Sequence, residues 1–228
     1  MQNLLSHLSL FGGALRARWD GLFAGPPPID DAVTLADFID AQAAFLVQKG
    51  IYEYSRARAG HYAKVLFKEQ VFIDALDQSR WSAYPLGLAM VGELVEGVLR
   101  PYAGDDADGQ RDALSQLVLA VFDRYSEPTV LDAATWSAAR LELARRLALV
   151  GLHPTKRAFE IADPYLKAYF DLLPINATLK RSELPTIHGY LRATLCNVHA
   201  ELTRRMHAPA VVASLRAGQA GAKDFATP

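Results

Sequence analysis

The stretch TLADFIDAQAAFLVQKGIYEYSRAR, residues 34–58, places its apolar side chains three and four positions apart. That spacing collects them on one side of an α-helix, whereas a half-buried strand alternates every second residue. Thr34 followed by Asp37 resembles a helix-capping arrangement, and Gly60 is a typical residue just beyond a helix end. The stretch therefore predicts one long helix.

The same spacing extends over most of the chain, and β-branched runs bounded by hairpin turns are missing. Proline removes a backbone donor, so we expect a break or kink at Pro85, and we expect Asp163 and Pro164 to divide residues 155–173 into two short helices. Further helices are expected over residues 3–23, 68–99, 110–125, 132–150 and 182–206. The sequence thus predicts an all-α fold, an irregular bundle of about seven or eight helices in a single domain.

Three parts follow from this pattern. Residues 1–28 read as an amphipathic N-terminal helix and a Pro-rich spacer, which ends in Pro26, Pro27 and Pro28. Residues 29–208 form the helical bundle domain. Residues 209–228, rich in Ala and Gly, are expected to be a flexible tail.

Composition excludes several classes of protein. The chain has 228 residues, 51% of them apolar, which is enough to bury a substantial core, and its net charge of −1 disfavours nucleic-acid binding. No apolar run reaches the ~18 to 20 residues of a transmembrane helix, and no positive start precedes an apolar signal core. The single cysteine, Cys196, fits a reducing compartment. We therefore expect a cytoplasmic protein.

The predicted first helix carries one apolar stripe opposite a small polar face. The stripe consists of Leu4, Leu8, Phe11, Leu15, Trp19 and Leu22. Gly12 and Gly13 weaken an isolated helix by roughly 1 kcal/mol each, so the helix needs an apolar surface to lie against. Its own domain, a protein partner or second copy, and a membrane surface remain three alternatives. The partner-binding residues are then Leu8, Phe11, Leu15, Trp19 and Leu22.

The helix over residues 34–58 mixes polar residues into its apolar sector. Its apolar side is defined by Leu35, Phe38, Ile39, Phe45, Leu46 and Tyr52. Gln42, Lys49, Glu53 and Arg56 project into the same sector, and Glu53 lies four residues from Lys49 and three from Arg56. Arg80 lies on the apolar side of the next helix. This set is either a structural salt-bridge ribbon or a polar pocket that receives an anionic ligand.

The last predicted helix offers a second group of reactive side chains. Cys196 and His199 are three apart and could supply two metal ligands or a thiol and base pair, although packing is the simpler interpretation. His188 and His199 are too far apart along a helix to share a metal. Asp37 and Asp40 read as ordinary surface charges. With the standard nucleophile, phosphate-loop and zinc motifs absent, we expect no catalytic residue, no metal and no cofactor.

Two segments resemble a group of small all-helical bacterial proteins, some of which are labelled esterase. They are residues 34–58, quoted above, and LLPINATLKRSELPTIHGYLRATLCNVHAELTRRM, residues 172–206. The resemblance covers about a quarter of the chain. It implies an all-helical fold and brings no catalytic residues to this sequence.

Three functions are consistent with these observations. The first is a soluble helical interaction, assembly or adaptor protein without catalytic activity, which would use the first helix to contact a partner or its own copy. The second is a domain that binds a small anionic molecule through the polar ribbon. The third is a helical hydrolase.

Overall fold

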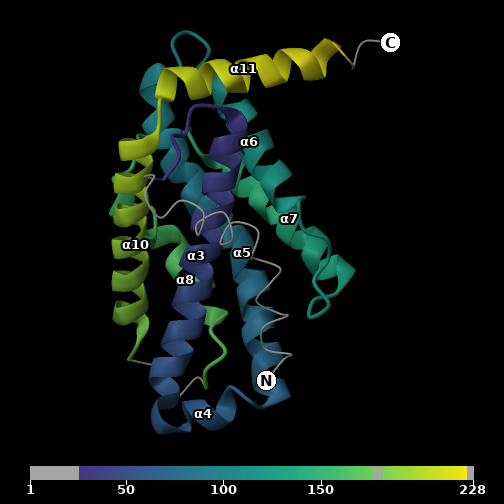
Figure 1. Ribbon diagram of the computed structural model, residues 1–228, viewed down its shortest axis with the longest axis vertical. Coiled ribbons are helices and arrows are strands. Elements are labelled where there is room, and N and C mark those ends of the chain that lie inside the picture. The colour runs from purple at the N-terminus through teal and green to yellow at the C-terminus, as the bar shows by residue number, and fades with distance from the viewer. Residues whose placement is uncertain (1–25, 177–179, 181, 225–228) are drawn as a thin grey trace.

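The computed structural model describes residues 26–176, 180 and 182–224, and for residues 219–224 it describes the backbone only. In this part of the chain the regular elements are helices, and the one β-bridge joins Ile29 to Met206. The helices pack into one bundle, so the predicted all-α single domain is confirmed (Figure 1). The predicted N-terminal helix over residues 3–23 lies outside the described residues.

Two long helices form the centre of the bundle. Helix α3 spans Ala32–Ala59 and helix α5 spans Gln70–Leu99, and they run side by side (Figure 1). They approach closely where a Cβ on Gly87 would lie 3.0 Å from the Ala43 carbonyl oxygen. The single-turn helix α4, Ala63–Leu66, crosses between them at one end of the bundle.

The remaining helices surround this pair (Figure 1). Helix α10, Leu184–Arg205, packs beside α3 and α5, while α6, Ala107–Phe122, and α7, Ala133–Leu149, cover another side. Between α7 and α10 the chain forms two 3₁₀ turns, Ala158–Glu160 and Asp163–Tyr165, and the short helix α8, Leu166–Asp171. The expected division near Asp163 and Pro164 is present as a 3₁₀ turn that leads into α8.

The start of α3 differs from the prediction. Asp31 is the capping residue: its carboxylate accepts a hydrogen bond from the Thr34 backbone N–H at 2.7 Å. Thr34 lies three residues further along, and its hydroxyl accepts a hydrogen bond from the Asp31 backbone N–H at 3.2 Å. The predicted end at Gly60 is confirmed, and this glycine adopts φ of 51°.

Helix α5 continues through Pro85, so the expected break is absent. Every residue from Ala83 to Glu96 is buried, so packing on all sides compensates for the backbone hydrogen bond that proline removes. Tertiary burial outweighs local preference here, and this apolar helix centre is where the candidate site begins.

The expected flexible tail instead continues as helix α11, Ala208–Asp224. Val211, Val212 and Leu215 are buried in the core, and the Ser214 hydroxyl accepts a hydrogen bond from the Ala32 N–H at the start of α3. Their three- and four-residue spacing gives this Ala-rich segment a side to bury. The expectation of a flexible tail was therefore wrong where α11 packs.

The interpretation of Asp40 as an ordinary surface charge was also wrong. Its carboxylate accepts hydrogen bonds from the hydroxyls of Tyr84 at 2.6 Å and Tyr125 at 2.9 Å. Burial, and then the charge of Asp40, raises the pKa of both tyrosines. These tyrosines belong to an aromatic cluster with Trp81 and Trp136 that joins α5 to α7. Their bonds to Asp40 attach the cluster to α3.

Candidate functional site

Two glutamates lie inside the most apolar part of the bundle. Glu93 and Glu96 on α5 are 5% and 8% exposed, and they are the buried carboxylates of the described chain. They are three residues apart, and Arg100, which caps the end of α5, follows Glu96 by four, so all three lie on one side of this helix and its cap. A buried carboxylate needs donors, and both of these have them.

Glu93 is held by residues far along the sequence. Its Oε1 accepts a hydrogen bond from the Lys156 ammonium at 2.7 Å, and the His153 Nε2 lies 3.6 Å from the same oxygen. The Tyr165 hydroxyl donates to Oε2 at 3.2 Å. Burial and the Glu93 charge raise the pKa of Tyr165, so its hydroxyl keeps its proton at neutral pH.

Glu96 forms a two-pronged pair with Arg100. The guanidinium Nε donates to Oε1 at 2.8 Å and Nη2 donates to Oε2 at 2.6 Å. These bonds raise the pKa of Arg100. Arg100 Nη1 also donates to the His153 carbonyl oxygen at 2.8 Å, which ties α5 to the segment that carries Lys156.

Two glycines let that segment approach α5. Gly151 adopts φ of 88°, a conformation that side-chain-bearing residues rarely adopt, and it turns the chain after α7. A Cβ on Gly97 would lie 3.0 Å from the Thr155 methyl group, so Gly97 leaves room for the segment to cross α5. The crossing places His153 and Lys156 over Glu93.

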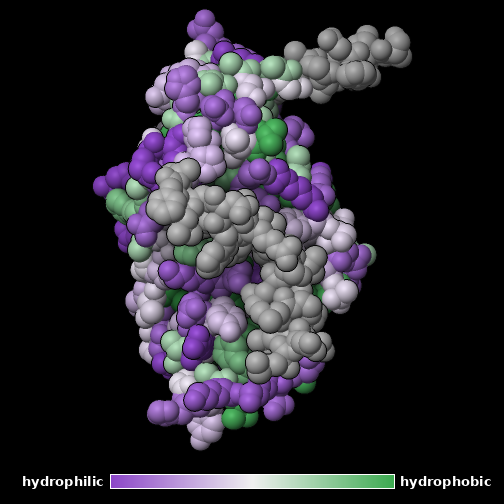
Figure 2. Space-filling model, viewed as in Figure 1, coloured by the Kyte–Doolittle hydropathy of each residue, from purple (hydrophilic) through white to green (hydrophobic). Residues whose placement is uncertain are grey.

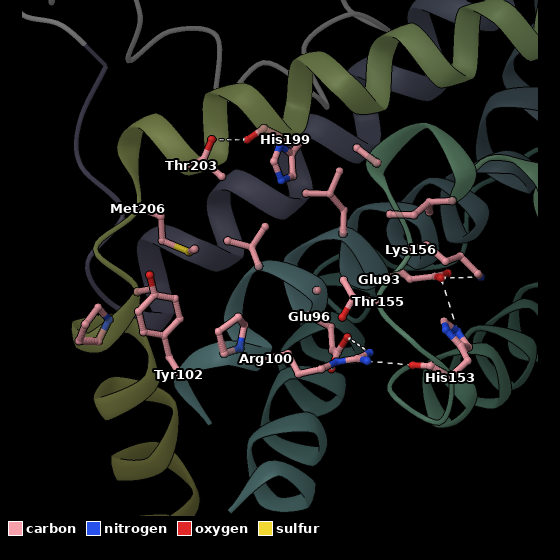
Figure 3. A pocket seen from close by; sticks show the side chains of 18 of the residues that line it. Glu93, Glu96, Arg100, Tyr102, His153, Thr155, Lys156, His199, Thr203 and Met206 are labelled. Carbon is pink, nitrogen blue, oxygen red and sulfur yellow. Dashed lines mark hydrogen bonds and ion pairs between the residues drawn. The ribbon is translucent and has the colours of Figure 1, made fainter. Parts of the chain in front are cut away.

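A cavity of about 500 Å³ opens beside these pairs. Figure 3 shows α5 on one side of it, residues 153–156 on a second and α10 on a third. His199 and Thr203 of α10 lie across the cavity from Glu93 and Lys156. The polar side chains that line it are Glu93, Glu96, Arg100, Tyr102, His153, Thr155, Lys156, His199, Thr203 and His207.

Hydrogen-bond donors remain for a ligand at this cavity. Each oxygen of Glu93 and Glu96 already accepts a bond from a protein side chain. An ammonium carries three N–H groups and a guanidinium five, so Lys156 and Arg100 keep donors beyond the bonds described. With the two carboxylates balanced by these two cations, the arrangement can receive a negatively charged group.

The predicted polar ribbon does not form inside the bundle. Lys49, Glu53 and Arg56 are exposed on α3, and Gln42 is half-buried. The Lys49 ammonium lies 5.1 Å from the centre of the Phe45 ring. The expected placement in the helical core was therefore wrong for these three charged residues, because the buried side of α3 follows Leu35, Ile39, Ala43, Leu46 and Ile51 instead.

Arg80 is the one member of the predicted ribbon that does not belong to α3. It sits on α5 and pairs with Asp77 at 3.1 Å. Its burial, the larger effect, lowers its pKa against the attraction of Asp77. The predicted partner-binding residues Leu8, Phe11, Leu15, Trp19 and Leu22 lie outside the described residues.

The histidines and the cysteine of α10 have separate surroundings. His188 Nε2 lies 2.6 Å from the Asp163 carboxylate, Cys196 is exposed, and His199 lines the cavity. Among the described residues, no three His, Cys, Asp or Glu side chains are grouped as metal ligands would be. None of the described helices is both long enough and apolar enough to cross a bilayer.

Sequence reasoning missed this site. A signal was present, because Glu93 and Glu96 interrupt the otherwise uncharged run of residues 81–99. The partners of Glu93 gave no such signal, because His153 and Lys156 lie in an irregular segment after Gly151. In comparisons with known proteins, no family model, curated protein or solved structure matches the chain.

Proposed function

We propose that this protein binds a small organic anion, a molecule bearing a carboxylate or phosphate group, in the cavity between α5, α10 and residues 153–156. The observation that supports the proposal most is the different state of the carboxylates and the cations at the cavity. The carboxylates of Glu93 and Glu96 are engaged within the protein, while Lys156 and Arg100 retain N–H groups. An anion can accept hydrogen bonds from these remaining N–H groups without displacing the carboxylates.

The size of the cavity supports a metabolite-sized ligand. A volume of about 500 Å³ falls within the range of small-molecule sites, roughly 300 to 1,000 Å³. The Lys156 and Arg100 side chains are 30% and 27% exposed, so solvent already reaches both cations. A charged group can therefore reach them without unfolding the site.

The wall formed by α10 and the residues that follow it supplies the groups that would select among anions. The Thr203 hydroxyl donates to the His199 carbonyl oxygen at 2.8 Å, so its lone pairs stay available. An imidazole can donate or accept at each ring nitrogen. His199 and His207 would then contact the part of the ligand that extends away from Lys156.

Isothermal titration calorimetry of the full chain tests the proposal. The titrants are small mono- and dicarboxylates and phosphate monoesters, with uncharged amides of the same size for comparison. We expect at least one anion to bind and its amide not to bind. Lys156→Gln should weaken that binding about tenfold, because a charge-assisted hydrogen bond is lost.

Lys167→Gln is the matched control. Lys167 is also a lysine paired with a carboxylate, that of Asp171, but it lies on α8 and does not line the cavity. Its replacement should leave the affinity unchanged. Equal loss in both variants, or heat from the amides equal to that from the anions, would contradict the proposal.

A further inference from the structure

The far end of the α3–α5 pair exposes apolar side chains. We call residues 52–72, the end of α3, the turn containing α4 and the start of α5, the tip. Within the tip Tyr62 is 75% exposed, Val65 58% and Val71 83%. Figure 2 shows hydrophobic and strongly hydrophilic residues side by side at this end of the molecule. Apolar groups gathered at a protruding end are typical of a contact surface.

Ring contacts hold the tip in this arrangement. Phe67 turns inward, with its ring centre 4.9 Å from that of Tyr52 and 5.2 Å from that of Phe72. These edge-to-face contacts fix α4 against both long helices. Tyr62 and Val65, three residues apart, then remain on the outside.

Three of the four cations of the tip lack, among the described residues, the carboxylate partners that most cations of the body have. Within the described chain, Arg56, Lys64 and Lys68 form no ion pair, whereas most cations of the body pair with a carboxylate. Arg58 pairs with Glu183 at 3.1 Å. Residues 52–72 carry four Lys or Arg and two Glu, a net charge of +2 in a chain whose net charge is −1.

We infer that the tip docks on an anionic lipid surface. Tyr62, Val65 and Val71 would enter the headgroup and acyl boundary, while Arg56, Lys64 and Lys68 contact lipid phosphates and carboxylates. Within the tip the carboxylates are Glu53 and Glu69. Asp74 lies two residues beyond the tip and accepts a hydrogen bond from the Gln70 amide at 2.8 Å.

The shape and charge of the tip favour this occupant over a protein. A second copy would bring together two surfaces of the same positive sign. Figure 1 shows α4 crossing between the long helices at one end of the bundle. Tyr62, Val65 and Val71, which belong to this end, are exposed. A lipid boundary accommodates separate projecting side chains, while a protein partner needs a shaped pocket for each of them.

Vesicle co-sedimentation of the full chain tests the inference, with vesicles of phosphatidylcholine alone and of phosphatidylcholine with phosphatidylserine. We expect binding to the anionic vesicles only, weakening as salt is raised. Lys64→Gln and Lys68→Gln should each reduce partitioning about fivefold. Replacing Tyr62, Val65 and Val71 together by Ser should reduce it about tenfold or more.

Two substitutions away from the tip serve as controls. Leu141→Ser removes an apolar side chain on α7 that is 67% exposed, and Arg204→Gln removes an exposed cation at the far end of α10. Both should bind anionic vesicles as the unchanged chain does. Equal binding to neutral vesicles, tip variants that bind normally, or a tip-dependent dimer in sedimentation velocity would overturn the inference.

Discussion

The cavity and the tip depart from ordinary protein chemistry in opposite directions. At the cavity, charged groups lie inside the bundle: Glu93 and Glu96 are buried, and every carboxylate oxygen has a donor. At the tip, apolar groups lie outside and Arg56, Lys64 and Lys68 have no carboxylate partner among the described residues. Substitutions of the charged residues at the cavity should therefore lower the free energy of unfolding. Substitutions of the exposed residues at the tip should leave it almost unchanged.

Breaking the Glu96–Arg100 pair gives the largest expected difference between the regions. Arg100→Met should lower the free energy of unfolding by about 2 to 3 kcal/mol, because it leaves a buried carboxylate without its partner. Lys64→Met at the tip should change it by less than about 0.5 kcal/mol. Urea denaturation measures both values.

The double variant Glu96→Leu with Arg100→Met sharpens that test. Removing both partners should recover most of the lost stability, since no uncompensated charge remains. A double variant as unstable as Arg100→Met would show that packing, and not the unpaired charge, causes the loss.

Two glycines with positive φ provide a second comparison. Gly151→Ala should cost about 2 kcal/mol, because φ of 88° strains any side chain and a Cβ would lie 2.8 Å from the Arg111 Cδ. Gly60→Ala should cost about 1 kcal/mol, since φ is 51° but no atom lies within 4 Å. Thermal unfolding of both variants checks which one loses more stability. An equal loss would mean that backbone strain alone causes it and that contact with Arg111 adds nothing.

Alkaline pH should affect the cavity through Tyr165. Its pKa is raised above the ordinary value of 10.0, so its contribution to stability is complete below pH 10 and is lost as the pH rises further. The loss per group is at most about 1.4 kcal/mol per pH unit. In Tyr165→Phe, stability measured between pH 9 and 11 should fall less steeply than in the unchanged chain. Equal slopes would contradict the burial of this hydroxyl against Glu93.

The smallest expected effect concerns the exposed apolar residues of the tip. Val71→Ser should change the free energy of unfolding by less than about 0.5 kcal/mol, because the side chain is already in water. Urea denaturation again provides the measurement. A loss above 1 kcal/mol would mean that Val71 packs against the fold, and the contrast with the cavity would disappear.

Much of the fold was accessible from the sequence, because apolar spacing fixes helices and Gly60 marks an end. What failed depended on tertiary packing. Burial on all sides carries α5 through Pro85, and three apolar residues turn the Ala-rich tail into α11. Local patterns do not contain this information.

The two candidate sites show the same limit. Phe45 and Tyr52 were assigned to the buried side of α3 but are exposed, and this error placed Lys49, Glu53 and Arg56 in the core. Glu93 and Glu96 could be noticed as charges within an apolar run, but nothing local says that Lys156 reaches them. That contact depends on the turn at Gly151 and the crossing over Gly97.

The most direct test of anion binding uses the histidine rings as reporters in an NMR titration. His153, His199 and His207 line the cavity, while His61 and His188 do not. As a binding carboxylate or phosphate monoester is added, the ring signals of the three cavity histidines should shift together and saturate, and those of His61 and His188 should stay in place. Signals that remain unmoved for every anion tested, or that move equally in the five histidines named here, would contradict a ligand site in this cavity.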